Sequence, residues 1–328
     1  MKTLSWGSLL MGVVLCTCNM RAEEGVRWIS HGGEEGCLEL RNSTTRVVLG
    51  PQRGGRVLSY RLRDDEALQQ APADPKRADV RPSMLPGGRF DVGPENGLPP
   101  HPVLWSGAWR AEATGVRAGR LTSEIDPATG LQLVRDFVLA PDSSRLRCTQ
   151  TMINRGASPR VTFHWSRTFA PPGGTCVVPL NPESRYPLGY VVFSGKNTID
   201  FQPEPDAAVE SRDGQLLIRA QPRFRKFAID AVEGWLAYVQ PGGLVFAKRF
   251  PVYADRVYGE IAGNSVSIWY NEAIAVEIEP IGPRERLTPG ERASFTEEWS
   301  LHAAPRDAAG GTDWKALRQR VSSLPFGL

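Results

Sequence analysis

Two carboxylates lie two residues apart near the C-terminal end of the chain, at Glu277 and Glu279. The apolar residues Val276 and Ile278 alternate with them. Alternation with a period of two predicts a β-strand, so both carboxylates project from the same face. A partly buried glutamate titrates near neutral pH and can act as a general base. The alternative is a solvated outer face, but Trp269, on the polar face of the preceding strand, favours a pocket.

A second group of candidate residues lies in residues 64–104, a stretch rich in proline and glycine. Arg89 and Asp91 can hydrogen-bond a polar ligand, and the neighbouring glycines let the backbone approach it. His101 follows in the same stretch. The stretch is too long for an ordinary connection, so we expect it to pack over the sheet face that carries Glu279, with Arg89 nearest the carboxylates. Ordinary surface charge is the alternative.

Nine tryptophans are available in the sequence. We expect four of them to be able to offer ring faces to a ligand, and these are Trp105, Trp109, Trp165 and Trp269. In a β-sandwich most tryptophans belong to the core, which is the alternative for each of them.

The elements that must position these side chains are strands. Strand patterns recur about every ten residues, which is typical of an all-β sandwich or barrel, and no strand is followed by a convincing crossover helix. We predict one antiparallel β domain over residues 38–302, after a flexible start at 23–37. A linker and tail follow at 303–328, with a short helix at about 313–322 capped by Thr312.

The N-terminal residues 1–22 have the pattern of a signal peptide. Lys2 precedes an apolar stretch from Leu9 to Leu15 that is too short to span a bilayer. We therefore expect a secreted or periplasmic protein, with lipid anchoring at Cys16 or Cys18 as the alternative. No later segment is long and apolar enough to cross a membrane.

Composition excludes several other classes. The 328 residues are 41% hydrophobic and 23% charged with a net charge of +3, so nucleic acid is not an expected partner. We also expect a monomer.

Three cysteines follow the signal peptide, at Cys37, Cys148 and Cys176. We favour buried thiols, although one disulfide can form among them. With four histidines, no CxxC pair and no phosphate or dinucleotide loop, we expect neither a metal site nor a cofactor.

Two segments carry a family resemblance. Residues 148–165, Cys-Thr-Gln-Thr-Met-Ile-Asn-Arg-Gly-Ala-Ser-Pro-Arg-Val-Thr-Phe-His-Trp, resemble the strand, proline turn and histidine-bearing strand of aldose 1-epimerases. Residues 276–279 followed by Leu-Thr-Pro-Gly-Glu at 287–291 are similar to that family's C-terminal pattern. The chain thus looks like a member of the galactose mutarotase-like superfamily, and is similar to an uncharacterised family of secreted bacterial proteins within it.

The resemblance implies a large antiparallel β-supersandwich and an extracytoplasmic carbohydrate-active protein, with aldose 1-epimerase-like chemistry at the anomeric carbon. It implies His164 as the acid and Glu279 as the base. We expect the substrate-binding residues to be Arg89, Asp91, His101, Trp165, Trp269 and Glu277. The residues after His164 depart from the family pattern, and the family's earlier histidine has no clear match besides His101. A non-catalytic carbohydrate-binding protein is therefore the alternative, and a polysaccharide lyase a further one.

Overall fold

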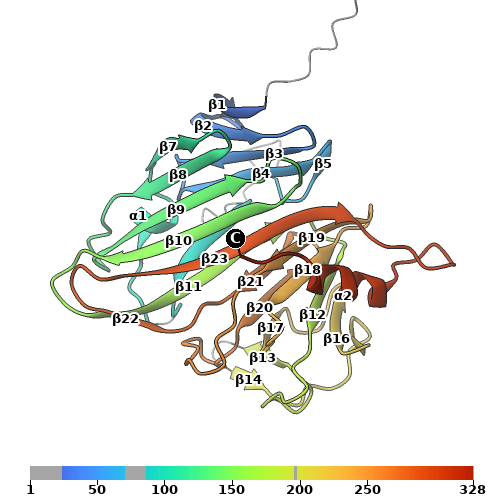
Figure 1. Cartoon of the computed structure of the whole chain (residues 1–328). Coiled ribbons are helices and arrows are strands. Elements are labelled where there is room, and N and C mark those ends of the chain that lie inside the picture. The colour runs from blue at the N-terminus through green and yellow to red at the C-terminus, as the bar shows by residue number, and fades with distance from the viewer. Residues whose placement is uncertain (1–23, 71–85, 96, 196–197, 328) are drawn as a thin grey trace, which may run out of the picture.

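Two antiparallel β-sheets packed face to face make up the molecule (Figure 1). The computed structural model describes residues 24–70, 86–95, 97–195 and 198–327. Within these residues every pair of neighbouring strands is antiparallel, and the helices are short. The antiparallel β-sandwich predicted from the alternating sequence is therefore confirmed.

The larger sheet has 13 strands in the described part of the chain. Eleven of them follow one another across the sheet in the order β1 (Gly25–His31), β2 (Glu34–Arg41), β3 (Thr45–Gly50), β4 (Arg56–Leu62), β6 (Gly88–Gly93), β11 (Arg160–Ala170), β21 (Ala275–Pro280), β20 (Val266–Asn271), β17 (Lys226–Ile229), β13 (Val191–Gly195) and β14 (Thr198–Asp200). Two short strands lie off this path: β5 (Asp65–Glu66) pairs with β4, and β22 (Glu285–Leu287) pairs with β11.

The second sheet has ten strands. Their order is β15 (Val209–Arg212), β16 (Gln215–Arg219), β12 (Thr175–Pro179), β18 (Trp235–Val239), β19 (Leu244–Arg249), β23 (Arg292–Ala303), β10 (Leu146–Asn154), β9 (Leu131–Leu139), β8 (Ala118–Ser123) and β7 (Trp109–Gly115). The helix α2 (Trp314–Ser322) covers part of its outer face, because Leu317 and Val321 pack on β18 and β19. The other helix, α1 (Pro102–Trp105), is a single turn.

The core between the sheets comes from the period-two alternation of the strands. In β9 every second residue from Leu131 to Leu139 is buried, and Phe137 among them contacts Phe90 of the facing sheet. Trp299 of β23 stacks on Phe90 with ring centroids 5.5 Å apart. Burial of such aromatic side chains is a main source of stability.

This core also holds a charged network. Lys248 and Glu297 are both fully buried, and their Nζ and Oε2 atoms lie 3.2 Å apart. His164 lies 2.8 Å from Glu297 through its Nε2 atom, and Gln150 approaches its Nδ1 atom at 3.1 Å. Burial alone would raise the pKa of Glu297, but Lys248 and His164 outweigh burial and lower this pKa to about 2. The network therefore places an ionised carboxylate between the sheets, with Lys248 as its counter-charge.

Two boundaries differ from the sequence-based expectation. The expected flexible start at 23–37 is wrong for its described residues, since β1 and the beginning of β2 form a hairpin there. Val26 packs at the margin of the core, and Cys37 is buried. The cap of α2 is Asp313 and not Thr312, since the Asp313 carboxylate accepts a hydrogen bond from the backbone of Ala316.

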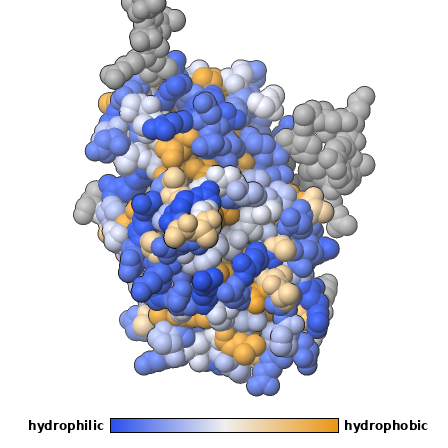
Figure 2. Space-filling model, turned by 90° about the vertical axis from the view of Figure 1, so that its right-hand side faces the viewer, coloured by the Kyte–Doolittle hydropathy of each residue, from blue (hydrophilic) through white to orange (hydrophobic). Residues whose placement is uncertain are grey.

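Other features agree with the sequence. Cys37, Cys148 and Cys176 are free, buried thiols, as favoured. In the described residues, no helix has the length and hydrophobicity needed to cross a bilayer. The surface shown in Figure 2 is mainly hydrophilic, and its hydrophobic residues form separate patches.

Candidate functional site

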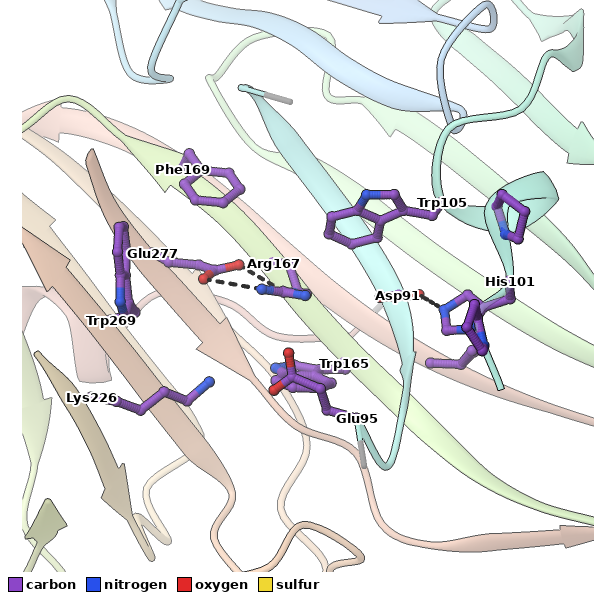
Figure 3. Close-up of a pocket in the computed structure, with 13 residues that line it drawn as sticks. Asp91, Glu95, His101, Trp105, Trp165, Arg167, Phe169, Lys226, Trp269 and Glu277 are labelled. Atoms are coloured by element: carbon purple, nitrogen blue, oxygen red, sulfur yellow. Dashed lines mark hydrogen bonds and ion pairs between the residues drawn. The ribbon is translucent and has the colours of Figure 1, made fainter. Parts of the chain in front are cut away.

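A cleft of about 770 Å³ opens on the face of the larger sheet that points away from the second sheet. Its floor comes from β6, β11, β21, β20 and β17, and one wall comes from Glu95, Pro100, His101, Pro102 and Trp105. The lining residues are Asp91, Val92, Glu95, Pro100, His101, Pro102, Trp105, Trp165, Arg167, Phe169, Lys226, Trp269 and Glu277 (Figure 3). Its volume lies within the range of about 300–1,000 Å³ that is typical of small-molecule sites.

Strand alternation puts these side chains together. Trp165, Arg167 and Phe169 follow one another at every second position of β11, so all three face the cleft. The register of the sheet sets Trp165 beside Asp91 of β6, and Phe169 beside Glu277 of β21. The cleft is thus built on rigid central strands rather than on loops alone.

An ion pair between Arg167 and Glu277 occupies the middle of the cleft. The Arg167 Nε atom donates to Glu277 Oε1 at 2.7 Å, and Nη2 donates to Oε2 at 3.5 Å. Burial would lower the pKa of Arg167, but Glu277 and Glu279 outweigh it and raise this pKa above its usual value. In Figure 3 the pair lies between Trp105 on one side and Trp269 on the other.

Glu279 lies directly beside this pair and is fully buried. Its Oε2 atom accepts a hydrogen bond from Trp165 Nε1 at 2.6 Å and lies 3.4 Å from Lys226 Nζ. Its Oε1 atom is buried and accepts no hydrogen bond within the described residues. Burial raises the pKa of Glu279 to about 7, and Lys226 acts in the opposite direction. This carboxyl group can therefore both accept and donate a proton near neutral pH.

A second charged pair closes the other end of the cleft. His101 Nε2 lies 3.0 Å from Asp91 Oδ1 (Figure 3). Burial would lower the pKa of His101, but the Asp91 carboxylate raises it to about 9. Burial would raise the pKa of Asp91, but His101 outweighs it and lowers that pKa. The imidazole is therefore cationic at neutral pH.

Arg89 supports the cleft wall from behind. Its guanidinium lies 3.3 Å from the centre of the Trp105 ring and donates a hydrogen bond to the Trp105 carbonyl oxygen. Burial lowers the pKa of Arg89 well below its usual value. Arg167 lies 4.9 Å from the same ring centre on Trp105. Two guanidinium groups thus hold this tryptophan over the cleft.

The architecture is shared with known structures. No family model matches the chain, and no curated protein matches it either. A galactose mutarotase-like protein from Clostridium acetobutylicum superposes with a TM-score of 0.57 at 10% identity, over 85% of this chain and 98% of that one. One from Lactobacillus casei superposes with a TM-score of 0.56 at 11% identity, over 81% and 100%.

The chain has the galactose mutarotase-like fold. At these identities the likeness shows the architecture, and the chemistry has to be argued from the side chains of this chain.

Within the galactose mutarotase-like sandwich the two predicted catalytic residues do not converge. His164 precedes Trp165 in β11, so its side chain points between the sheets and not into the cleft. Its exposed fraction is 1%, both ring nitrogens have protein partners, and Phe295 stacks on it with ring centroids 4.7 Å apart. His164 and Glu279 therefore face opposite sides of the sheet, and one sugar ring cannot contact both.

The predicted binding residues are brought together in part. Asp91, His101, Trp165, Trp269 and Glu277 all line the cleft. Pro100, His101, Pro102 and Trp105 form part of the wall, as expected for this stretch. Residues 88–93 of the same stretch do not pack over the sheet but form its strand β6, and residues 71–85 lie outside the described residues.

Arg89 does not hold the position that we expected for it. The cations that act on Glu279 are Lys226 and Arg167. Arg89 is buried behind Trp105, because strand β6 is separated from β21 by β11.

Arg167, Phe169 and Lys226 lie on the floor of the cleft, and the sequence analysis did not identify them. Arg167 and Phe169 could have been predicted from the sequence, since they continue the alternation that begins at Trp165. Lys226 could not have been predicted, because only the long-range pairing of β17 with β20 sets it beside Trp269. The described residues contain no group of three potential metal ligands, and nothing in the lining points to a cofactor.

The pKa of Glu279 predicts a pH dependence of stability. Its folded value of about 7 exceeds the ordinary 4.5, so the folded state holds a proton that the unfolded state has released between these values. Stability supplied by this group therefore falls as pH rises from about 4.5 to about 7, by about 1.4 kcal/mol for each pH unit in that window. We expect the difference in unfolding free energy between the wild type and Glu279→Gln, measured in urea, to fall over the same window.

Trp165→Phe is the matched variant for this experiment. It removes the hydrogen bond that stabilises the ionised form of Glu279. In the Trp165→Phe protein the pKa of Glu279 should be higher, so the difference in unfolding free energy should keep falling to a higher pH than in the wild type. A difference between wild type and Glu279→Gln that stays constant from pH 4.5 to pH 7 contradicts the raised pKa.

Proposed function

We propose that the protein binds a carbohydrate in this cleft. The observation that carries the proposal is that Trp105, Trp165 and Trp269 line the same cavity as two charged pairs. Aromatic rings pack against the C–H faces of a sugar, while carboxylate, guanidinium and imidazole groups bond its hydroxyls. The mutarotase-like fold supports the same interpretation by analogy.

The charges of the cleft favour an uncharged sugar. Glu277 is balanced by Arg167, Asp91 by His101, and Glu279 by Lys226. A phosphate or carboxylate group on the ligand has to compete with one of these acidic partners for its cation. The proposal includes a location outside the cytoplasm, which rests on the sequence of residues 1–22.

A fluorescence titration tests binding. We expect D-glucose, D-galactose, D-mannose or their oligosaccharides to change the tryptophan emission saturably. Trp269→Ala should raise the dissociation constant about tenfold or more, as is typical when a central aromatic contact is lost. The matched control is Trp28→Ala, since Trp28 is 57% exposed on the edge strand β1. Equal effects of both substitutions, or no saturable change with any sugar, contradict the proposal.

A second candidate function is aldose 1-epimerase-like catalysis in the same cleft. The observation that favours it is the carboxyl of Glu279 with a pKa of about 7, in a site that also holds the cationic imidazole of His101. The base takes the proton of the anomeric hydroxyl, the bond from C1 to the ring oxygen breaks, and the acid protonates that oxygen. Rotation of the resulting aldehyde and reversal of both transfers yield the other anomer.

In this candidate mechanism we assign the base to Glu279 and the acid to His101, since His164 lies outside the cleft. Glu279 is fully buried beneath the lining and contacts Trp165 and Lys226, so a sugar reaches it only if neighbouring side chains move. Polarimetry tests the reaction. Decay of the optical rotation of fresh α-anomers should accelerate with the wild type and return to the spontaneous rate with Glu279→Gln. If the sugars bind saturably but their optical rotation decays at the spontaneous rate, the protein binds these sugars without catalysing their epimerisation.

A further inference from the structure

A second groove lies on the outer face of the second sheet, on the side of the sandwich opposite the cleft. Its floor is the end of β23, where Glu298, Ser300 and His302 take every second position and point away from the core. Arg249 of β19 lies beside Glu298 in register. The C-terminal end of α2 and residues 142–145 form its sides. The groove encloses about 520 Å³, enough for a small molecule.

Four polar atoms at this floor are buried without a hydrogen-bond partner in the described residues. They are Glu298 Oε2, Ser300 Oγ, His302 Nε2 and Arg249 Nε. Glu298 is only 3% exposed, and Arg145 Nη1 lies 3.8 Å from its Oε2 atom, too far for a hydrogen bond. Buried polar groups are nearly always hydrogen-bonded, so a cluster of unpaired atoms around one cavity points to a molecule that completes them.

The remaining contacts fix what these atoms can offer. The other oxygen of Glu298, Oε1, accepts from Arg147 Nη2 at 2.8 Å, which leaves the Oε2 atom as an acceptor. Arg249 donates through Nη1 to the carbonyls of Val321, Ser322 and Leu324, which leaves its Nε–H as a donor. Burial and the charge of Arg320 lower the pKa of His302 to about 4, so this imidazole is neutral.

The groove therefore presents an acceptor, a donor, a hydroxyl and a neutral imidazole along one line. A hydroxyl group both donates and accepts, so a ligand with several hydroxyls matches this alternation. Three arginines also line the groove, but each already has a partner: Arg145 lies 3.8 Å from Glu298, Arg249 donates to three carbonyls, and Arg320 donates to the Ala303 carbonyl. An anion would have to compete with these partners and would lie against the Oε2 atom of Glu298, so it fits less well than a neutral hydroxyl. A metal ion fits poorly as well, because the described residues hold no group of three ligands. Leu324 and Pro325 supply an apolar side for C–H groups.

We propose that this groove is a second binding site, which takes an uncharged polyol or sugar through its hydroxyl groups. The site shares no residue with the cleft, so it stands or falls independently of the function proposed there.

The imidazole of His302 reports on this groove and that of His101 on the cleft. The experiment is a nuclear magnetic resonance titration of the full chain, labelled at histidine, with D-glucose, D-galactose, D-mannose and inorganic phosphate. We expect at least one sugar to shift the His302 signal saturably, and phosphate to leave it unchanged. Ser300→Leu, which removes the hydroxyl and narrows the groove, should raise the dissociation constant read at His302 about tenfold or more.

Ser294→Leu is the matched control, because Ser294 lies on the same face of β23 outside the groove. It should leave the dissociation constant at His302 unchanged, and neither variant should alter the response of His101. The proposal is overturned if no sugar shifts His302, if only phosphate does, or if Ser294→Leu weakens binding as much as Ser300→Leu.

Discussion

Replacing Glu297 by glutamine should lower the free energy of unfolding by about 3–5 kcal/mol, the usual loss when one member of a buried ion pair is removed. The ammonium group of Lys248 is fully buried, and Glu297 is its counter-charge at 3.2 Å. Ser166 and Thr168 also accept from Lys248, but neither carries a charge. Since the free energy of unfolding of a domain is only about 5–15 kcal/mol, this loss is a large fraction of the total stability. Urea unfolding at pH 7 measures the loss.

Two further variants separate the charge effect from packing. Glu112→Gln removes an exposed partner of Arg110 and should cost less than about 1 kcal/mol. Adding Lys248→Met to Glu297→Gln removes the uncompensated charge and should recover part of the loss. If the double variant is as unstable as the single one, the ion pair is not the cause.

The same pair predicts the response to acid. The folded pKa of Glu297 is about 2, below its ordinary value of 4.5. A group whose pKa is lowered by folding contributes stability above its unfolded pKa and loses it as pH falls through the folded value. The difference between wild type and Glu297→Gln should therefore be complete above pH 4.5 and shrink towards pH 2.

This network explains why the catalytic prediction for His164 could not be settled from sequence. Strand alternation correctly separates His164 from Trp165, but it does not say which face of a strand points into the core. With Phe163 and Trp165 apolar and Ser166 polar, the local pattern favours His164 outside the core, which is the wrong assignment. The answer depends on Glu297 and Gln150, which are distant in sequence and come to His164 only through sheet packing.

The fold itself was predictable, because it depends on local patterns. Period-two alternation identified most of the strands, and the shared face of Glu277 and Glu279 follows directly from it. Asp91, Trp165, Trp269 and Glu277 face one cleft for the same reason, whereas His101 reaches it from the turn before α1. The register of β6 against β11, which turns Arg89 behind Trp105, is a long-range property that no local pattern contains.

Replacing Arg167 by methionine should raise the dissociation constant of a cleft-bound sugar about 30-fold or more, corresponding to the 2 kcal/mol or more typical of breaking a buried hydrogen-bonded charge pair. Arg167 bonds Glu277 through two nitrogens, and its guanidinium lies 5.0 Å from the ring centre of Trp165. Without it, two carboxylates at positions 277 and 279 share Lys226 as their nearby cation, which favours proton uptake. Arg167→Lys keeps the charge but not the two-nitrogen geometry, so it should recover binding only in part.

Stability and binding have to be read separately, because Arg167→Met also leaves the buried Glu277 carboxylate unpaired. Combining it with Glu277→Gln removes that charge, and we expect the free energy of unfolding to recover in part while sugar binding does not. Arg46→Met is the matched control, since Arg46 pairs with the buried Glu39 on strands outside the cleft. It should lower stability and leave the dissociation constant unchanged. If the combined variant binds sugar as tightly as the wild type, Arg167 serves only to neutralise Glu277, and the ligand makes no contact with its guanidinium.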